Sequence, residues 1–170
     1  MQDQNSNPYA SPNAPIIEHE SQGPELASFA QRLLGAIVDG LIMLAILMPI
    51  MFVSGYFAAI TSGVRPGFFD NLKWGVVGFV IFLVVQGYFL NANGQTIGKK
   101  VMGTRIVTLD NEKPEFIKLI ALRYLSIQAI SQIPILGAIF GLVNALFIFA
   151  GDQRQCLHDK FAGTKVIVDK

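Results

Sequence analysis

The stretch "RLLGAIVDGLIMLAILMPIMFV", residues 32–53, decides the fold class of this chain. After its opening arginine the stretch carries one charged residue, Asp39, and fourteen uncharged residues follow. At 1.5 Å per residue a helix of this length crosses the roughly 30 Å hydrocarbon core of a bilayer. A bare carboxylate inside such a helix is costly, so it is normally neutralised or paired. The stretch therefore predicts a membrane helix whose aspartate needs a partner.

The composition of the whole chain supports a membrane environment. The chain has 170 residues, of which 52% are hydrophobic and 15% are charged, whereas soluble domains carry about 25% charged residues. Three long apolar segments stand out, at 29–60, 74–90 and 116–150. The last segment is too long for one ordinary crossing, and Pro134 and Gly137 interrupt it. We therefore divide it into two helices, at about 115–132 and 135–150.

These segments predict an all-α membrane protein with four transmembrane helices. The third predicted helix, at 115–132, contains Lys118 and Arg123. Such a helix either faces protein or water, or lies in the membrane interface as an amphipathic element. The sequence leaves this choice open.

The distribution of basic residues predicts the orientation of the helices. Four crossings place both termini and the connection 91–114 on one side, and the positive-inside rule makes this side the cytoplasm. The basic residues predicted on this side are Lys99, Lys100, Arg105, Lys113, Arg154, Lys160, Lys165 and Lys170, against Arg65 and Lys73 on the other. Residues 1–28 contain no lysine or arginine and lack an apolar core. We interpret them as a disordered acidic tail before a single transmembrane domain at 29–168.

A short sequence is repeated within the chain. "KKVMGTRIVTLD" at 99–110 is similar to "DKFAGTKVIVDK" at 159–170, with a lysine, a Gly-Thr pair and a base in the same order. Both copies end in β-branched residues, which favour strands. The predicted topology brings both copies to the cytoplasmic side. We therefore expect them to pair as a small cytoplasmic β-ribbon, followed by a turn at Asp110-Asn111.

Three blocks of the sequence, "RLLGAIVDG", "GQTIGKKVMGTRIV" and "LHDKFAGTKVIV", resemble the signatures of the RDD family of bacterial membrane proteins. The family is named for one arginine and two aspartates, and the matching residues here are Arg32, Asp39 and Asp159. The resemblance covers about residues 29–168. It implies a multi-pass protein of the bacterial inner membrane. Some members of the family are linked to cation–proton exchange or other transport, and most have no assigned function.

Two interpretations of Asp39 remain open at this stage. Arg32 lies two helical turns away, about 10 Å along the axis, which is too far for a direct ion pair. In the first interpretation Asp39 is a protonatable site in a cation or proton pathway, with nearby polar ligands Gln86, Gln128 and Asn144. In the second it forms an ion pair with Arg123 that fixes the helix packing. Arg32 is expected at the interface, within reach of lipid phosphates or of Asp159.

Other motifs carry little functional signal. "NGQTIGKK" lacks the spacing of a nucleotide-binding phosphate loop and the Ser or Thr that ends it. We expect an interfacial turn there, with Lys99 and Lys100 contacting lipid headgroups. His158 and Asp159 lack a nucleophile context, and Cys156 is a bystander. The sequence thus indicates no catalytic residue, cofactor or metal site, and its net charge of +1 gives no reason to expect nucleic-acid binding.

Two functions follow from these observations. The first is a small transporter, or a transporter subunit, for a cation, a proton or another small solute. The alternative is a membrane accessory or assembly protein without transport activity of its own. Four short helices make a thin wall for a transport path, so a homo-oligomer or a partner membrane protein is expected in either case. The first function requires a continuous polar path past Asp39, whereas the alternative requires an Asp39 that is fully paired.

Overall fold

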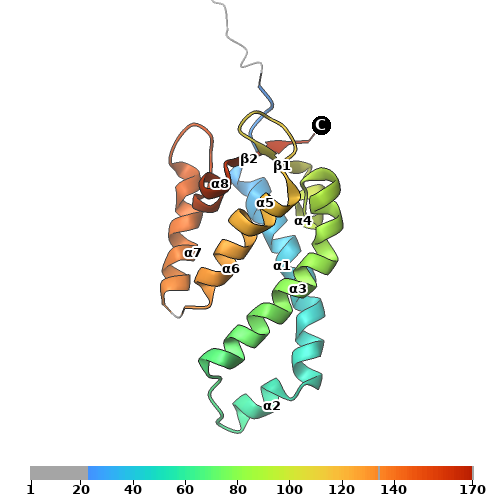
Figure 1. Cartoon of the computed structure of the whole chain (residues 1–170), viewed down its shortest axis with the longest axis vertical. Helices are drawn as coiled ribbons and strands as arrows, with labels where there is room; N and C mark the ends of the chain where they lie inside the picture. The colour runs from blue at the N-terminus through green and yellow to red at the C-terminus, as the bar shows by residue number, and fades with distance from the viewer. Residues whose placement is uncertain (1–22, 134, 170) are drawn as a thin grey trace, which may run out of the picture.

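The computed structural model describes residues 23–133 and 135–169, and this part of the chain is mostly helical. Two helices, α1 (Phe29–Val53) and α3 (Phe68–Asn93), are long and apolar enough to cross a membrane. Both start or end near a small sheet, and the short helix α2 (Tyr56–Thr61) joins them at the opposite end (Figure 1). These two helices form the long axis of the molecule.

The ends of α1 and α3 follow from local hydrogen bonds. Ser28 begins α1 with a capping box, in which its Oγ accepts from Gln31 N at 3.2 Å and Gln31 Oε1 accepts from Ser28 N at 2.9 Å. Pro49 does not end α1, which continues to Val53. α3 begins at Phe68, before the apolar segment identified at 74–90, and Asp70 accepts from the backbone N–H of Gly67 at 3.1 Å at this start.

The third apolar segment, at 116–150, forms two shorter helical rods, as predicted. The first rod is a continuous run of α5 (Phe116–Leu119), the π-helical η1 (Ile120–Leu125) and α6 (Ser126–Ser131). The second rod consists of α7 (Leu136–Leu146) and the 3₁₀ turn η2 (Phe147–Phe149). The predicted breaker Pro134 lies outside the described residues. At about 24 Å the first rod is shorter than a typical crossing, so length alone does not establish four transmembrane helices.

The predicted ribbon is confirmed. β1 (Thr104–Thr108) and β2 (Thr164–Val168) pair antiparallel, and each strand follows a short helix, α4 (Ile97–Val101) or α8 (Leu157–Ala162). The turn after β1 is also confirmed, because Asn111 adopts a left-handed conformation and its N–H donates to Thr108 O. The ribbon therefore joins the middle of the chain to its C-terminal part.

The end of each half of the described chain has the same order of elements. A short helix, a left-handed glycine and a strand follow one another in both halves. Ile106 pairs with Val166, its counterpart in the sequence repeat, so equivalent residues of the two copies meet in the ribbon. A side chain before each short helix repeats one hydrogen bond: Gln95 Nε2 donates to Thr104 O at 3.1 Å, and Gln155 Nε2 donates to Thr164 O at 2.7 Å. The repeat is therefore one of structure as well as sequence.

The buried core lies where the ribbon meets the helices. Its members come from the chain before α1, from α3, from both strands and from α5, and are Ala27, Leu90, Ile106, Leu119 and Val166. Residues 1–22 of the predicted tail lie outside the described residues. The end of that tail is ordered, because Ala27 N donates to Val166 O at 3.0 Å and Leu26 forms a bridge with Ile167. The folded domain thus begins a few residues earlier than predicted.

Candidate functional site

Asp39 on α1 is held by donors from two other elements. Its Oδ1 accepts from Gln86 Nε2 of α3 at 2.9 Å and from the backbone N–H of Gly98 at 2.7 Å. Its Oδ2 accepts from the hydroxyl of Thr96 at 2.5 Å, and Thr96 is the N-cap of α4. The amide oxygen of Gln86 accepts from Ile97 N at 2.8 Å. The carboxylate therefore fastens the start of α4 to both long helices, where the helix dipole also favours negative charge.

Two glycines make this close contact sterically feasible. A methyl group placed on Gly98 would lie 2.0 Å from the carbonyl oxygen of Gly35 and 2.9 Å from the carboxyl carbon of Asp39. A methyl group on Gly35 would lie 3.3 Å from Gly98 O. The backbones of α1 and α4 therefore touch directly, and this approach brings the N–H of Gly98 within reach of Asp39.

Asp159 forms a second, separate cluster at the start of α8. Its Oδ2 accepts from Arg32 of α1 and from the backbone N–H of Cys156, each at 3.1 Å. Its Oδ1 binds the guanidinium of Arg123 from η1. Arg123 also donates to the hydroxyl of Thr164 at 2.8 Å, and Arg32 donates to Val166 O at 3.2 Å. The fully buried carboxylate of Asp159 thus holds one arginine from α1 and one from η1, and both arginines also bind β2.

The two arginines determine the protonation of this cluster. Burial alone would raise the pKa of Asp159, but Arg123, His158 and Arg32 outweigh it, so the pKa lies below its usual value. Burial, and then the charge of Arg123, lower the pKa of His158 to about 3. At neutral pH the cluster therefore holds two guanidinium cations, one carboxylate and a neutral imidazole.

The ion pair expected between Asp39 and Arg123 is not formed. Arg123 binds Asp159, and Asp39 is held by neutral donors. The physical reason is that Gly98 and Thr96 bring hydrogen-bond donors to Asp39, while Asp159 lies closer to both arginines. The expected contact between Arg32 and Asp159 is present.

Only one of the three predicted polar neighbours of Asp39 is beside it. Gln86 contacts Asp39 directly and is fully buried. Gln128 instead donates to Gly75 O of α3 at 3.1 Å. Asn144 accepts from the backbone of His158 and contacts its ring, with Oδ1 2.7 Å from Nδ1. In the described residues these side chains do not form one polar path.

The two lysines predicted to contact lipid have different surroundings. Lys100 is exposed, with its Nζ 5.0 Å from the centre of the Phe89 ring. Lys99 is half-buried, and burial followed by the charge of Arg123 lowers its pKa to about 8. Lys100 therefore suits a headgroup contact, whereas Lys99 is less accessible to one.

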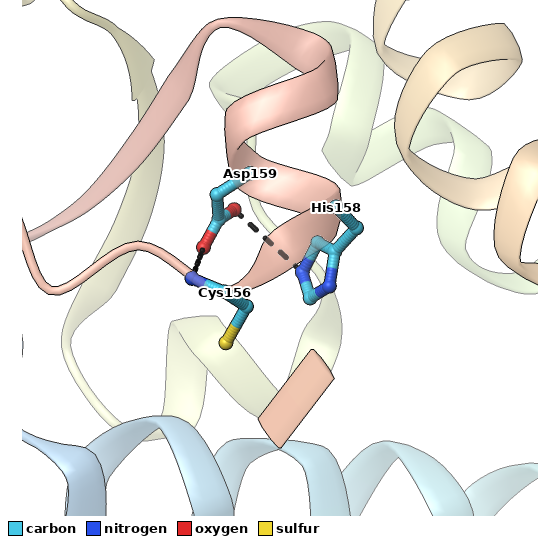
Figure 2. A group of neighbouring side chains, drawn as sticks. All are labelled: Cys156, His158 and Asp159. Atoms are coloured by element: carbon cyan, nitrogen blue, oxygen red, sulfur yellow. Dashed lines mark hydrogen bonds and ion pairs between the residues drawn. The ribbon is translucent and has the colours of Figure 1, made fainter. Parts of the chain in front are cut away.

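Cys156, His158 and Asp159 lie close enough to resemble a metal site (Figure 2). Their potential ligand atoms are within 4.8 Å of one another. The surrounding charges oppose a cation, because both oxygens of Asp159 already bind guanidinium groups. Burial also raises the pKa of the Cys156 thiol, which disfavours the thiolate that binds metals. The donor set fits the role of an arginine counter-ion better than that of a metal ligand set.

Sequence reasoning missed several residues that build these clusters. Thr96 and Gly98 supply two of the donors to Asp39, and Thr164 orients Arg123. The sequence repeat gave a signal for Thr164, because Thr104 occupies the same place in the first copy. Both threonines are buried in the structure. Gln95 and Gln155 also occupy equivalent places, so the repeat begins before the two quoted copies at 99–110 and 159–170.

The surroundings of His158 predict a loss of stability in mild acid. Its pKa in the folded state is about 3, against 6.5 for an unperturbed histidine, so below pH 6.5 the unfolded state binds a proton that the folded state does not. The free energy of unfolding is therefore not reduced by His158 above about pH 6.5, and it decreases progressively as the pH falls from 6.5 towards 3. We expect the melting temperature in detergent to fall over this range, and to fall less steeply in His158→Gln.

A control variant separates this effect from the general loss of a histidine. His19→Gln removes the other histidine, which lies outside the described residues. Equal pH profiles for wild type and His158→Gln would contradict the assignment.

The comparisons with known proteins come from sequence alone, because no solved structure matches the chain. A curated relative, described as an uncharacterized protein of Haemophilus influenzae, is 30% identical over 97 residues. The match covers 56% of this chain and 59% of the relative, so the chain spans about three fifths of that protein's length. The model of the RDD family, a family of membrane proteins, matches residues 26–163 and therefore includes Arg32, Asp39 and Asp159. The chain belongs to the RDD family of membrane proteins.

Proposed function

We propose that all four helical rods cross a bacterial inner membrane, with the ribbon on the cytoplasmic side. The contact between Gln128 and Gly75 supports this topology. It places the end of the first short rod beside Trp74, an aromatic residue of the kind that marks membrane interfaces. From Trp74 to Leu90 α3 rises about 25 Å, and the short rod rises about 24 Å. Both distances match a hydrocarbon core that is slightly thinner than average.

Within this topology the chain acts as a membrane accessory or assembly protein, and it carries no solute by itself. The observation that supports this function is the complete pairing of Asp39 with Gln86, Thr96 and Gly98. A transport site has to exchange its ligands, whereas these three donors arise from packed elements. Five cavities within residues 23–133 and 135–169 are lined by other residues. The clusters at Asp39 and Asp159 then serve to hold the ribbon rigidly against the membrane helices.

Helix α7 supplies the surface for a partner, either a second copy of the chain or another membrane protein. None of its residues is buried. Its large exposed side chains include Leu142 and Leu146, and a methyl group on Gly141 would meet nothing within 4 Å. Small residues allow helices to approach closely in a membrane. A second helix therefore fits along α7 better than along the valine-rich outer face of α3.

Transport remains a second candidate because of Lys99. Burial, and then the charge of Arg123, lower the pKa of this half-buried amine to about 8, whereas the charges of Asp39 and Asp159 act in the opposite direction. Lys99 belongs to α4, whose N-cap Thr96 and backbone at Gly98 also bind Asp39. A proton-coupled carrier needs such a group, which gains or loses a proton near neutral pH, beside its ion site.

Flux measurements in proteoliposomes test the proposed function. We expect wild-type protein to give no proton or sodium flux above that of empty vesicles. We also expect Asp39→Asn to be inactive in this assay and less stable by about 1–3 kcal/mol, because its amide nitrogen would replace an acceptor either at the Thr96 hydroxyl or at the N–H donors of Gln86 and Gly98. Thermal unfolding in detergent measures the second effect. Asp152→Asn, an exposed change on the same side of the molecule, is the matched control.

One result would favour transport instead. Wild-type flux that Asp39→Asn abolishes, in a protein that inserts and melts like wild type, would contradict the accessory function. Loss of the same flux in Lys99→Met would then identify the lysine as part of the proton path.

A further inference from the structure

A cavity of about 480 Å³ lies between the end of α3 and the ribbon, away from both carboxylate clusters. Its lining is polar and includes three basic side chains, Lys100, Arg105 and Lys113, against one carboxylate, Asp169. Amide side chains from Asn93, Gln95 and Asn111 complete the polar part of the wall. Both amide donors of Gln95 are already used, by Thr104 O and Asp169. The net positive wall and the amides of Asn93 and Asn111 are suited to an anion.

The basic groups retain free donors. Lys100 Nζ lies over the Phe89 ring, which accepts no conventional hydrogen bond. Lys113 Nζ donates to one carbonyl, Asn91 O, at 3.0 Å, and an ammonium group has three N–H donors. Arg105 is half-exposed, and only its Nε approaches Asp169, at 3.5 Å. Most of the guanidinium donors therefore remain available.

Asp169 does not neutralise the site. One of its oxygens lies near Arg105, and the other accepts from Gln95 Nε2 at 2.8 Å. The carboxylate is thus held at one side of the cavity. Within residues 23–133 and 135–169, Lys100 and Lys113 form no ion pair with a carboxylate.

We propose that this cavity binds a phosphate group through Lys100, Arg105 and Lys113. Phosphate oxygens accept several charge-assisted hydrogen bonds at once, and arginine is suited to bind them in pairs. The lining has no aromatic ring on which a nucleobase could stack, so recognition concerns the phosphate alone. The group comes either from an anionic phospholipid at the adjacent membrane surface or from a soluble phosphate compound. The proposal is independent of the accessory function.

The sequence repeat provides a matched control residue. Lys160 on α8 corresponds to Lys100 on α4, and its Nζ lies 5.1 Å from the centre of the Phe147 ring. A separate cavity beside η2 and the start of α1 is lined by Arg154 as its one basic residue, and Lys160 lines neither this cavity nor the phosphate cavity. Lys100 and Lys160 are therefore both exposed lysines over a ring, but only Lys100 faces the phosphate cavity.

The experiment compares two triple variants of the full chain. Lys100→Gln, Arg105→Gln and Lys113→Gln are combined in the first, and Lys160→Gln, Arg154→Gln and Lys118→Gln in the second, so both lose the same charge. The lipid arm counts phosphatidylglycerol bound to protein released from nanodiscs of phosphatidylglycerol and phosphatidylcholine, by native mass spectrometry. The soluble arm measures binding of inorganic phosphate and of pyrophosphate in detergent by calorimetry.

We expect affinity for one probe to fall about a hundredfold in the first variant, because each basic group near an anionic surface contributes roughly 1 kcal/mol. The second variant should bind like wild type. Loss confined to phosphatidylglycerol would identify a lipid headgroup, and loss confined to phosphate or pyrophosphate a soluble ligand.

Two outcomes would overturn the proposal. Equal losses in the two variants would mean general surface electrostatics, and wild type that binds neither class of probe would mean no site. The six side chains lie outside the buried core, and melting temperatures of both variants confirm that any loss is not due to unfolding.

Discussion

Replacing Asp159 with asparagine is expected to produce the largest loss of stability of any single side-chain change in this protein. The carboxylate is fully buried and binds the guanidinium groups of Arg32 and Arg123. Asparagine leaves two buried cations with no anion between them. Breaking a buried ion pair by removing one partner costs about 3–5 kcal/mol. We therefore expect a much lower melting temperature in detergent and rapid proteolysis at the ribbon.

Two further variants test the cause of this loss. Asp152→Asn removes a carboxylate from the exposed loop before α8 and should leave the melting temperature unchanged. Arg123→Met in the Asp159→Asn background removes one of the two unpaired cations and should recover part of the loss. A melting temperature of Asp159→Asn equal to that of wild type would show that the two arginines do not depend on this carboxylate.

Replacing Gly98 with alanine is expected to separate α4 from α1. The added methyl group would lie 2.0 Å from Gly35 O, a distance that backbone atoms cannot accommodate without moving apart. The movement also removes the bond from Gly98 N to Asp39. Overpacking costs about 1–3 kcal/mol and the lost charge-assisted bond to the half-buried carboxylate about 1.5–3 kcal/mol, so we expect a loss of several kcal/mol.

Thermal unfolding of matched glycine variants measures this effect. Gly40→Ala changes a glycine of the same helix α1 where a methyl group meets nothing within 4 Å. This variant should be neutral or slightly stabilising, because alanine favours helices more than glycine does. Similar melting temperatures for Gly98→Ala and Gly40→Ala would contradict the close contact between α1 and α4.

The sequence by itself determined the features that depend on local patterns. Apolar length predicted α1 and α3, and the Gly-Thr repeat predicted a two-stranded ribbon. Each feature depends on residues that are close in sequence, or on a repeat that brings two similar strands together. The three blocks that resemble the RDD family also identified the family correctly.

Only the tertiary structure decided which charged groups meet. Arg123 was expected to pair with Asp39 but binds Asp159, and Asp39 is bound by Thr96 and Gly98 from an element distant in sequence. These partners depend on the approach of α4 to α1 within van der Waals distance, which the absence of side chains at Gly35 and Gly98 allows. Differences of a few ångströms decide which ion pair forms. Helix periodicity specifies which face a residue occupies, but it does not specify how closely two helices approach.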